Sequence, residues 1–256
     1  MDANIALRKE KILEMLSRDG RVDVNTLSDL FAVSKVTIRM DLKDLEEKGL
    51  LSRVHGGAIS SYKTYYNMNF TQRYSANEQE KKSIAARAAE LICDGDTIML
   101  NAGTTTLYIV RMLSGKKDLK IVTNSIAIAL EMAGNQNFHV VLLGGNVNTN
   151  YQFTFGTDAL HQLSAYKVDK LFLSVDGIDP VNGLTTYYEQ EAEMCRKMIS
   201  RANLSYVVAD TSKFDRVAFT KITPITSVGT IVTNRTLADE TFKTLKKLKV
   251  NMVLAE

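Results

Sequence analysis

The sequence predicts an α/β protein that consists of a small helical N-terminal domain, a linker and a larger domain built on a mostly parallel sheet. Two observations predict this organisation. Residues 1–60 contain three short helical patterns followed by a glycine-rich turn, whereas from residue 78 onward strand and helix patterns alternate. Strands that alternate with helices form a largely parallel sheet covered on both faces. We therefore predict one domain over residues 1–60, a polar, tyrosine-rich linker over 61–77 and a second domain over 78–256.

The composition is that of a globular protein without a membrane span, because hydrophobic residues make up 45% and charged residues 24% of the chain. No apolar run approaches the roughly 18 residues that a span needs, and the N-terminus lacks the layout of a secretory signal. We expect a cytoplasmic protein with no membrane partner. Cys93 and Cys195 form no CxxC motif, and neither His139 nor His161 has a partner at metal-ligand spacing. We therefore expect no disulfide, metal site or cofactor.

The overall charge does not reveal a partner. The chain carries a net charge of +3, and residues 1–60 hold ten Lys and Arg against ten Asp and Glu. A sum of zero in this segment means that any case for nucleic-acid binding depends on where the charges lie.

The first 60 residues predict three helices and a β-hairpin. The helical patterns cover Ile5–Leu16, Val24–Phe31 and Val36–Leu45, and Gly49 ends the third. Ser34 is placed to cap the third helix, because its hydroxyl can accept a hydrogen bond from a free amide of the first turn. The strands of the hairpin are residues 50–54 and 58–59, joined by His55-Gly56-Gly57. This order of elements describes a winged helix-turn-helix.

The third helix has an inward and an outward face. Ile38, Leu42 and Leu45 share the face that packs on the other helices, and Val36 and Met40 lie on the opposite face. A recognition helix contacts base edges mainly with its N-terminal half, and cations and hydroxyls there can bond to guanine or phosphate. The alternative is a solvated helix in a three-helix packing module. The predicted DNA-binding residues are Ser34, Lys35, Thr37, Arg39, Met40, Lys43, Arg53 and His55.

The second domain is predicted to contain helices at residues 80–92, 104–113, 125–133, 189–202 and 238–248. The predicted strands are residues 97–100, 119–122, 139–143, 170–175, 206–209, 230–232 and 251–254. Ligands of such sheets bind beyond the carboxyl ends of the strands. We therefore expect the site in the loops that follow these strands.

The loop after the strand at residues 97–100 suits a phosphate. Gly103 is followed by three threonines at the start of a helix, which offers free amides, hydroxyls and the positive end of the helix dipole. The same pattern also serves plain helix capping. Similarly, Asp176 and Asp179 fit a cleft or a solvated turn, and Lys213 fits a phosphate contact or a surface position. The predicted effector-binding residues are Asn101, Gly103, Thr104, Thr105, Thr106, Thr123, Asn124, Gly144, Gly145, Asp176, Asp179, Thr185, Glu189 and Lys213.

The segment Ser34–Leu42, followed by Leu45-Glu46, Gly49, Leu51, Arg53 and His55–Ala58, resembles the winged helix-turn-helix of DeoR-type bacterial regulators of sugar metabolism. The order of segments in the second domain resembles the effector domain of the same family. Two residues depart from the family pattern: Met40 stands where a basic or amide residue is common, and Asn101 stands where aspartate is usual.

This resemblance implies a transcriptional regulator, a repressor of a carbohydrate catabolic operon, controlled by a phosphorylated sugar. The implied partners are operator DNA and the sugar phosphate. A homo-oligomer, dimer or tetramer, is also expected, because one small recognition helix offers little specificity and dimers read paired half-sites. A helix-turn-helix protein that senses an unphosphorylated ligand is a further alternative.

An enzyme is the other alternative, because three segments also resemble ribose-5-phosphate isomerase: Gly103–Thr106, Asp176–Asp179 and Asp210–Lys213. In a sugar-phosphate isomerase with a DNA-binding appendage, Glu189 with one of the aspartates would supply the acid and base. The isomerase pattern has a lysine shortly after its second aspartate, and Pro180–Gly183 contains none. We therefore expect no catalytic residues.

Overall fold

The computed structural model of the chain describes residues 2–19, 21–48, 50–60 and 68–256. The chain forms two compact units, residues 1–78 and 79–256. Part of the predicted linker, residues 61–67, lies outside the described residues, as does Gly49. The remainder of the predicted linker contains a six-residue helix, α5 (Phe70–Ser75), whose first turn is closed by a capping box between Asn69 and Gln72.

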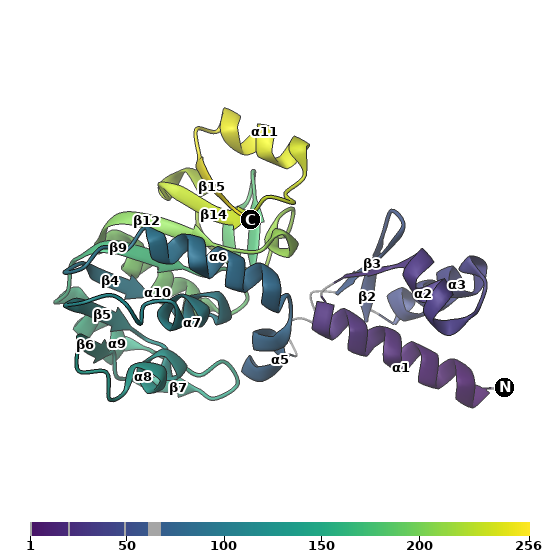
Figure 1. Cartoon of the computed structure of the whole chain (residues 1–256), viewed down its shortest axis with the longest axis horizontal. Helices are drawn as coiled ribbons and strands as arrows, with labels where there is room; N and C mark the ends of the chain where they lie inside the picture. The colour runs from purple at the N-terminus through teal and green to yellow at the C-terminus, as the bar shows by residue number, and fades with distance from the viewer. Residues whose placement is uncertain (1, 20, 49, 61–67) are drawn as a thin grey trace. The chain divides into compact units, whose positions relative to one another are not determined.

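The first unit contains the three predicted helices and a three-stranded sheet (Figure 1). The helices are α1 (Asp2–Asp19), α2 (Val24–Phe31) and α3 (Lys35–Glu47), and the strands are β1 (Arg21–Asp23), β2 (Leu51–Val54) and β3 (Gly57–Ser60). The sheet is antiparallel with the order β1-β3-β2.

Strand β1 was not predicted, because three residues are too few to show an alternating pattern. It is held by the core and by its neighbour: Val22 is buried, and Gly57 of β3 lies so close that a Cβ atom would be 2.0 Å from the Val22 carbonyl oxygen. Asp23 then caps α2 by accepting hydrogen bonds from the amides of Asn25 and Thr26 at 2.8 and 3.1 Å.

The second unit is built on a seven-stranded parallel sheet with the order β15-β14-β12-β9-β4-β5-β6 (Figure 1). Its strands are β4 (Thr97–Leu100), β5 (Leu119–Thr123), β6 (Phe138–Leu142), β9 (Val168–Leu173), β12 (Ala202–Val208), β14 (Thr230–Asn234) and β15 (Asn251–Ala255). The helices are α6 (Glu78–Glu90), α7 (Thr104–Arg111), α8 (Ile126–Met132), α9 (Thr157–Ser164), α10 (Glu189–Ser200) and α11 (Asp239–Lys247). The predicted fold class, a helix-turn-helix followed by a mostly parallel α/β domain, is confirmed.

The order of the strands indicates where a ligand-binding crevice is expected. From β4 the chain proceeds through β5 to β6 on one side, and then returns to place β9 on the other side of β4, followed by β12, β14 and β15. The sheet therefore reverses its direction of growth between β4 and β9. In open parallel sheets, the carboxyl ends of the strands at such a reversal form the crevice in which ligands bind.

Two small antiparallel sheets were not predicted, and no bounds were predicted for α9. One sheet joins β7 (Asn146–Asn148) with β8 (Phe153–Phe155), and the other joins β10 (Gly177–Asp179), β11 (Gly183–Thr186) and β13 (Thr220–Thr223). The turn before β11 needs glycine, because Gly183 has a φ of +85° and its Cβ would lie 2.3 Å from the Thr223 carbonyl oxygen. The strands of these two sheets have three or four residues each and lack the apolar runs by which the strands of the parallel sheet were predicted.

Candidate DNA-binding and effector sites

The N-terminus of α3 is closed by Ser34. The Ser34 hydroxyl accepts a hydrogen bond from the Thr37 amide at 3.1 Å and lies 2.9 Å from the Thr37 hydroxyl. Ile38, Leu42 and Leu45 are buried, and Val36 and Met40 are exposed on the other side of the helix. The remaining predicted DNA-binding residues, Lys35, Arg39, Lys43, Arg53 and His55, are also exposed.

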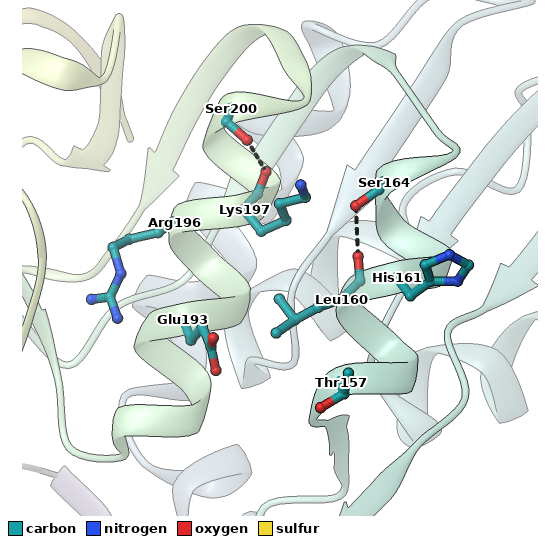
Figure 2. Close-up of a pocket in the computed structure, with 8 residues that line it drawn as sticks. All are labelled: Thr157, Leu160, His161, Ser164, Glu193, Arg196, Lys197 and Ser200. Carbon is teal, nitrogen blue, oxygen red and sulfur yellow. Dashed lines mark hydrogen bonds between the residues drawn. The ribbon is translucent and has the colours of Figure 1, made fainter.

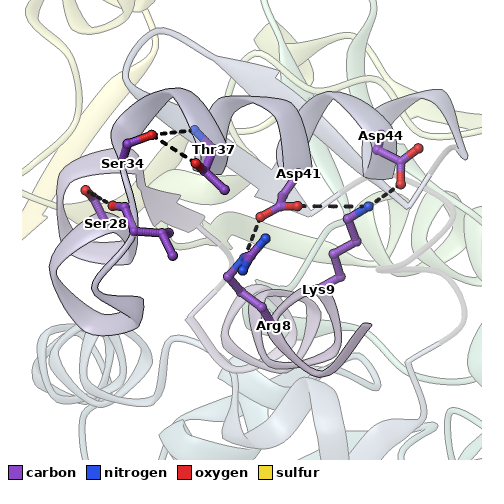
Figure 3. A network of polar contacts seen from close by, with 8 residues as sticks. Arg8, Lys9, Ser28, Ser34, Thr37, Asp41 and Asp44 are labelled. Carbon is purple, nitrogen blue, oxygen red and sulfur yellow. Dashed lines mark hydrogen bonds and ion pairs between the residues drawn. The ribbon is translucent and has the colours of Figure 1, made fainter. Parts of the chain in front are cut away.

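Two acidic residues fix α3 on α1 (Figure 3). Asp41 is buried and accepts a hydrogen bond from the Arg8 guanidinium at 2.6 Å, and Lys9 lies 3.9 Å from its other oxygen. Lys9 also pairs with Asp44, and its proximity lowers the pKa of the Asp44 carboxyl. These ion pairs use two cations and two acids of the first unit to hold α3 against α1.

The hairpin of β2 and β3, which we call the wing, is joined to α3 through Glu46. Its carboxylate accepts hydrogen bonds from the Arg53 amide at 2.8 Å and from Arg53 Nε at 2.6 Å, and these two bonds lower the pKa of Glu46. Lys43 lies 3.7 Å from Glu47 on the same helix. Two of the predicted DNA-binding cations therefore already have acidic neighbours. Arg39 and Arg53 line a common groove between the helix and the wing.

In the second unit, Asn101 bridges β4 and β9 at the point where the sheet reverses. Its side chain is buried, its Nδ2 donates to the Ser174 carbonyl at 2.9 Å, and its Oδ1 accepts from the Ser174 amide at 2.8 Å. Asn101 Nδ2 also lies 3.7 Å from the thiol of Cys195, whose pKa is raised by burial. The amide group thus ties together the two strand ends that flank the crevice.

The loop after β4 is held against the same serine. A Cβ atom at Gly103 would lie 2.4 Å from Ser174 Cβ, so only glycine fits there. The Thr106 hydroxyl lies 2.8 Å from the carbonyl oxygens of both Asn101 and Gly103, which closes the loop onto α7. Thr104 and Thr105 are buried in the first turn of this helix.

Thr123 and Asn124 brace this loop from β5. The Thr123 hydroxyl donates to the Leu100 carbonyl at 2.7 Å, and Asn124 accepts from the Ala102 amide at 3.1 Å. Gly144 and Gly145 are not brought to the same place, because they follow β6 at the edge of the sheet and β5 separates them from β4. The Gly144 amide instead donates to Gln162 of α9 at 2.9 Å.

The segment after β9 contributes a buried acidic group. Asp176 accepts hydrogen bonds from the Thr186 hydroxyl at 3.0 Å and from the Tyr187 amide at 3.1 Å. The Thr186 hydroxyl also lies 2.6 Å from a carboxylate oxygen of Glu191, which is buried as well. Glu191 was not predicted. The signal available for Glu191 was its spacing of three and four residues from Met194 and Cys195 on the buried face of α10.

Three other predicted residues have structural partners or lie at the surface. Asp179 accepts hydrogen bonds from the amides of Val181 and Asn182 at 3.0 and 2.6 Å. It therefore forms a turn, which is the second of the two alternatives that the sequence allowed. Thr185 accepts from the Ala218 amide at 2.8 Å, and Glu189 is exposed at the start of α10.

Lys213 lies in a buried charged cluster rather than at the surface. It ends a short 3-10 helix that follows β12, and it is buried together with Asp210 and Lys81. Burial alone would raise the pKa of Asp210, but the charges of Lys213 and Lys81 and the hydrogen bonds from Ser212 hold it below its usual value. Lys81 was not predicted, although its spacing from Ile84 places it on the inner face of α6.

Two family models match the chain. The model described as the DeoR C terminal sensor domain matches residues 76–235, and the DeoR-like helix-turn-helix domain matches residues 8–64. The chain belongs to the DeoR family of transcriptional regulators. We call residues 1–78 the helix-turn-helix unit and residues 79–256 the sensor unit.

Relatives match over most of the chain. The HTH-type transcriptional regulator YulB of Bacillus subtilis is 36% identical, with 97% of each chain covered. GlpR of Haloferax volcanii, an HTH-type transcriptional regulator, is 34% identical over 97% of each chain. GlcR of B. subtilis, an HTH-type transcriptional repressor, is 32% identical over 88% of this chain and 86% of its own.

Among solved structures, a D-ribose-5-phosphate isomerase in complex with phospho-erythronic acid is 23% identical over 54% of each chain, with a TM-score of 0.40. Within the described part of the chain, no helix has both the length and the apolar character required to cross a membrane. The same residues contain no group of three or more His, Cys, Asp or Glu side chains arranged to hold a metal ion.

The contact between α1 and α3 yields a stability prediction. Arg8→Ala should lower the free energy of unfolding of the helix-turn-helix unit by about 1.5–3 kcal/mol, because it leaves the buried Asp41 without its closest donor. Thermal unfolding followed by circular dichroism measures this loss. Lys43→Ala is the matched control: its pair with Glu47 is exposed, so the change should cost at most about 1 kcal/mol. Equal losses of unfolding free energy in the two variants would contradict a stabilising role for the buried contact between Arg8 and Asp41.

Proposed function

We propose that this regulator is a repressor of a carbohydrate catabolic operon and that a phosphorylated sugar, bound at the carboxyl ends of β4 and β9, controls its affinity for operator DNA. GlcR, one of its relatives, is named as a repressor. The observation that carries the ligand site is the packing of Gly103 against Ser174 at the reversal of the sheet, because it places the first turn of α7 at the crevice. Since the partner is chromosomal DNA, the proposed place of action is the cytoplasm.

The site offers its largest number of binding groups to the phosphate of the ligand. The first amides of α7 have no partner within the helix, and Gly103, its N-cap, supplies no side-chain oxygen to them. Thr104 and Thr105 add hydroxyls, and the N-terminus of a helix attracts an anion. Lys213 follows β12, which is next to β9, so a cation lies near the same edge of the sheet.

The sugar would meet the acidic side of the crevice. Carboxylates accept hydrogen bonds from the hydroxyl groups of a sugar, and a threonine hydroxyl can donate to them or accept from them. Asp176 with Thr186 and Glu191 forms such a set. Control of DNA binding requires that the ligand bind the DNA-competent and DNA-incompetent states unequally. We propose a homo-oligomer, dimer or tetramer, because a pair of recognition helices reads two half-sites.

We also propose that the sensor unit does not catalyse isomerisation. Asp179, one of the two aspartates that the isomerase pattern would use, is bonded within its own turn, and Pro180–Gly183 contains no lysine. Incubation of the pure protein with ribose 5-phosphate should yield no ribulose 5-phosphate above the rate without protein. Formation of the ketose at a rate proportional to protein concentration would contradict this part of the proposal.

Arg39→Ala tests the reading helix. Losing one bidentate guanine contact should cost about 1–3 kcal/mol of DNA affinity, whereas losing a phosphate contact should lower the slope of log affinity against log salt by about one. Fluorescence anisotropy at several salt concentrations, with a site selected from random-sequence DNA, separates the two. Arg87→Ala, which removes an exposed arginine from α6 of the sensor unit, is the matched control. If both variants bind like the parent, α3 does not read DNA through Arg39.

Lys213→Met tests the effector site. Removing a charge-assisted hydrogen bond worth about 1.5–3 kcal/mol should lower the affinity for the effector roughly ten- to hundredfold while DNA binding persists. Thermal shift and DNA release are measured with glucose 6-phosphate, fructose 1-phosphate and the corresponding free sugars, of which the phosphates alone should act. Because Lys213 lies beside the buried Asp210, the double variant Asp210→Asn/Lys213→Met, which removes both charges, controls for folding. Release of DNA by the parent and by both variants at the same effector concentration would remove Lys213 from the site.

A further inference from the structure

The outward face of α3 carries two exposed apolar side chains. Val36 is 63% and Met40 68% exposed, and a separation of four residues places them on the same face, one turn apart. Ile38, Leu42 and Leu45 already bury the opposite face of the helix. The exposed pair is therefore not required for the core of this unit, and neighbouring exposed apolar side chains indicate a contact surface.

The surroundings of this pair indicate a polyanionic partner. Residues 35–40 include two cations, Lys35 and Arg39, and no acid. The acids of α3 all lie in its C-terminal half, where Asp41, Asp44 and Glu46 contact Arg8, Lys9 and Arg53. In the described part of the chain, neither Lys35 nor Arg39 has an ion pair with an acid. An apolar pair flanked by available cations fits nucleic acid rather than the apolar groove of a protein.

We propose that Val36 and Met40 read thymine methyl groups in the major groove, so that the half-site carries thymines opposite the N-terminal half of α3. The thymine C5-methyl is the apolar group that a base pair presents in this groove. Lys35 and Arg39 then meet the phosphates or guanines on either side. This inference rests on the proposed DNA-binding function and names the chemical feature of the operator that these two side chains select.

Replacing thymine by uracil tests this contact directly, because it removes the methyl group and leaves base pairing unchanged. Burying one methyl group is worth about 0.8 kcal/mol, which corresponds to about a fourfold change in affinity. The effect of the base change and the effect of the side-chain change should not add, since both remove the same contact.

The experiment uses the full chain without effector. A binding site is first selected from random-sequence DNA, and each deoxythymidine of the selected site is then replaced in turn by deoxyuridine. Fluorescence anisotropy of the parent should show about a fourfold loss of affinity at one or more positions. In Val36→Ala or Met40→Ala the loss at one of these positions should disappear. Both side chains are exposed, so the variants should unfold at the temperature of the parent.

Two control variants isolate the contact. Leu130→Ala removes a leucine that is 75% exposed on α8 of the sensor unit, and it should retain the full preference for thymine. Lys35→Ala should weaken binding to the thymine and uracil sites alike and make the salt dependence shallower. A preference that is lost only with Val36 or Met40 supports the inference.

Three results would overturn it. If the parent binds every uracil-substituted site as well as the original, no methyl group is read, although DNA binding itself stands. If Val36→Ala and Met40→Ala both keep the preference of the parent, another side chain reads the methyl group. If no sequence is enriched from random DNA, the proposed DNA-reading function fails and this inference fails with it.

Discussion

The hydrogen bonds between the Asn101 amide and the backbone of Ser174 hold the sensor unit together at the place where its sheet reverses direction. They join the carboxyl ends of β4 and β9, and the close approach that they maintain is the reason why Gly103 has no room for a Cβ atom. An ionised aspartate at this position would have acceptors only. It could bond to the Ser174 amide but would face the Ser174 carbonyl oxygen without a proton to donate. In this chain the position is therefore a neutral brace, and the crevice beside it is less negative.

Over residues 1–60, ten cations and ten acids sum to zero, and the structure shows how a segment without net charge can still present a basic surface. Arg8, Lys9 and Arg53 are engaged by acids of α3. These pairs lie toward the C-terminal half of the helix and its contacts with α1 and the wing. The N-terminal half contains Lys35 and Arg39, neither of which has an ion pair with an acid among the described residues. The placement of ion pairs, and not the net charge, therefore decides which end of the helix presents available cations.

Periodicity predicted the long elements well, because α2, α3 and the strands of the parallel sheet bury continuous or regularly spaced apolar residues. It missed β1 and the short antiparallel strands of the sensor unit, which are fixed by tertiary pairing rather than by their own pattern. The sequence predicted the site in a set of strand-end loops, and the loops after β4, β5 and β9 contact one another in the structure. Sequence alone could not show that Asp179 is used by its own turn, nor that Lys81, distant in the chain, lies beside Asp210 and Lys213. Both depend on side-chain directions that only the folded chain defines.

The position of β4 in the sheet also bears on how the protein is made. Its two neighbours are β5, which follows it closely, and β9, which begins only at Val168, about seventy residues after Thr97. During synthesis the helix-turn-helix unit, whose core is formed by residues 12–58, emerges complete while β4 still lacks one partner. A nascent or truncated chain that ends before Val168 would therefore present a folded reading helix together with an open, apolar strand edge. Such an edge invites pairing with other chains. The edge of β4 stays open until residues 168–173 pair with it and close the sheet.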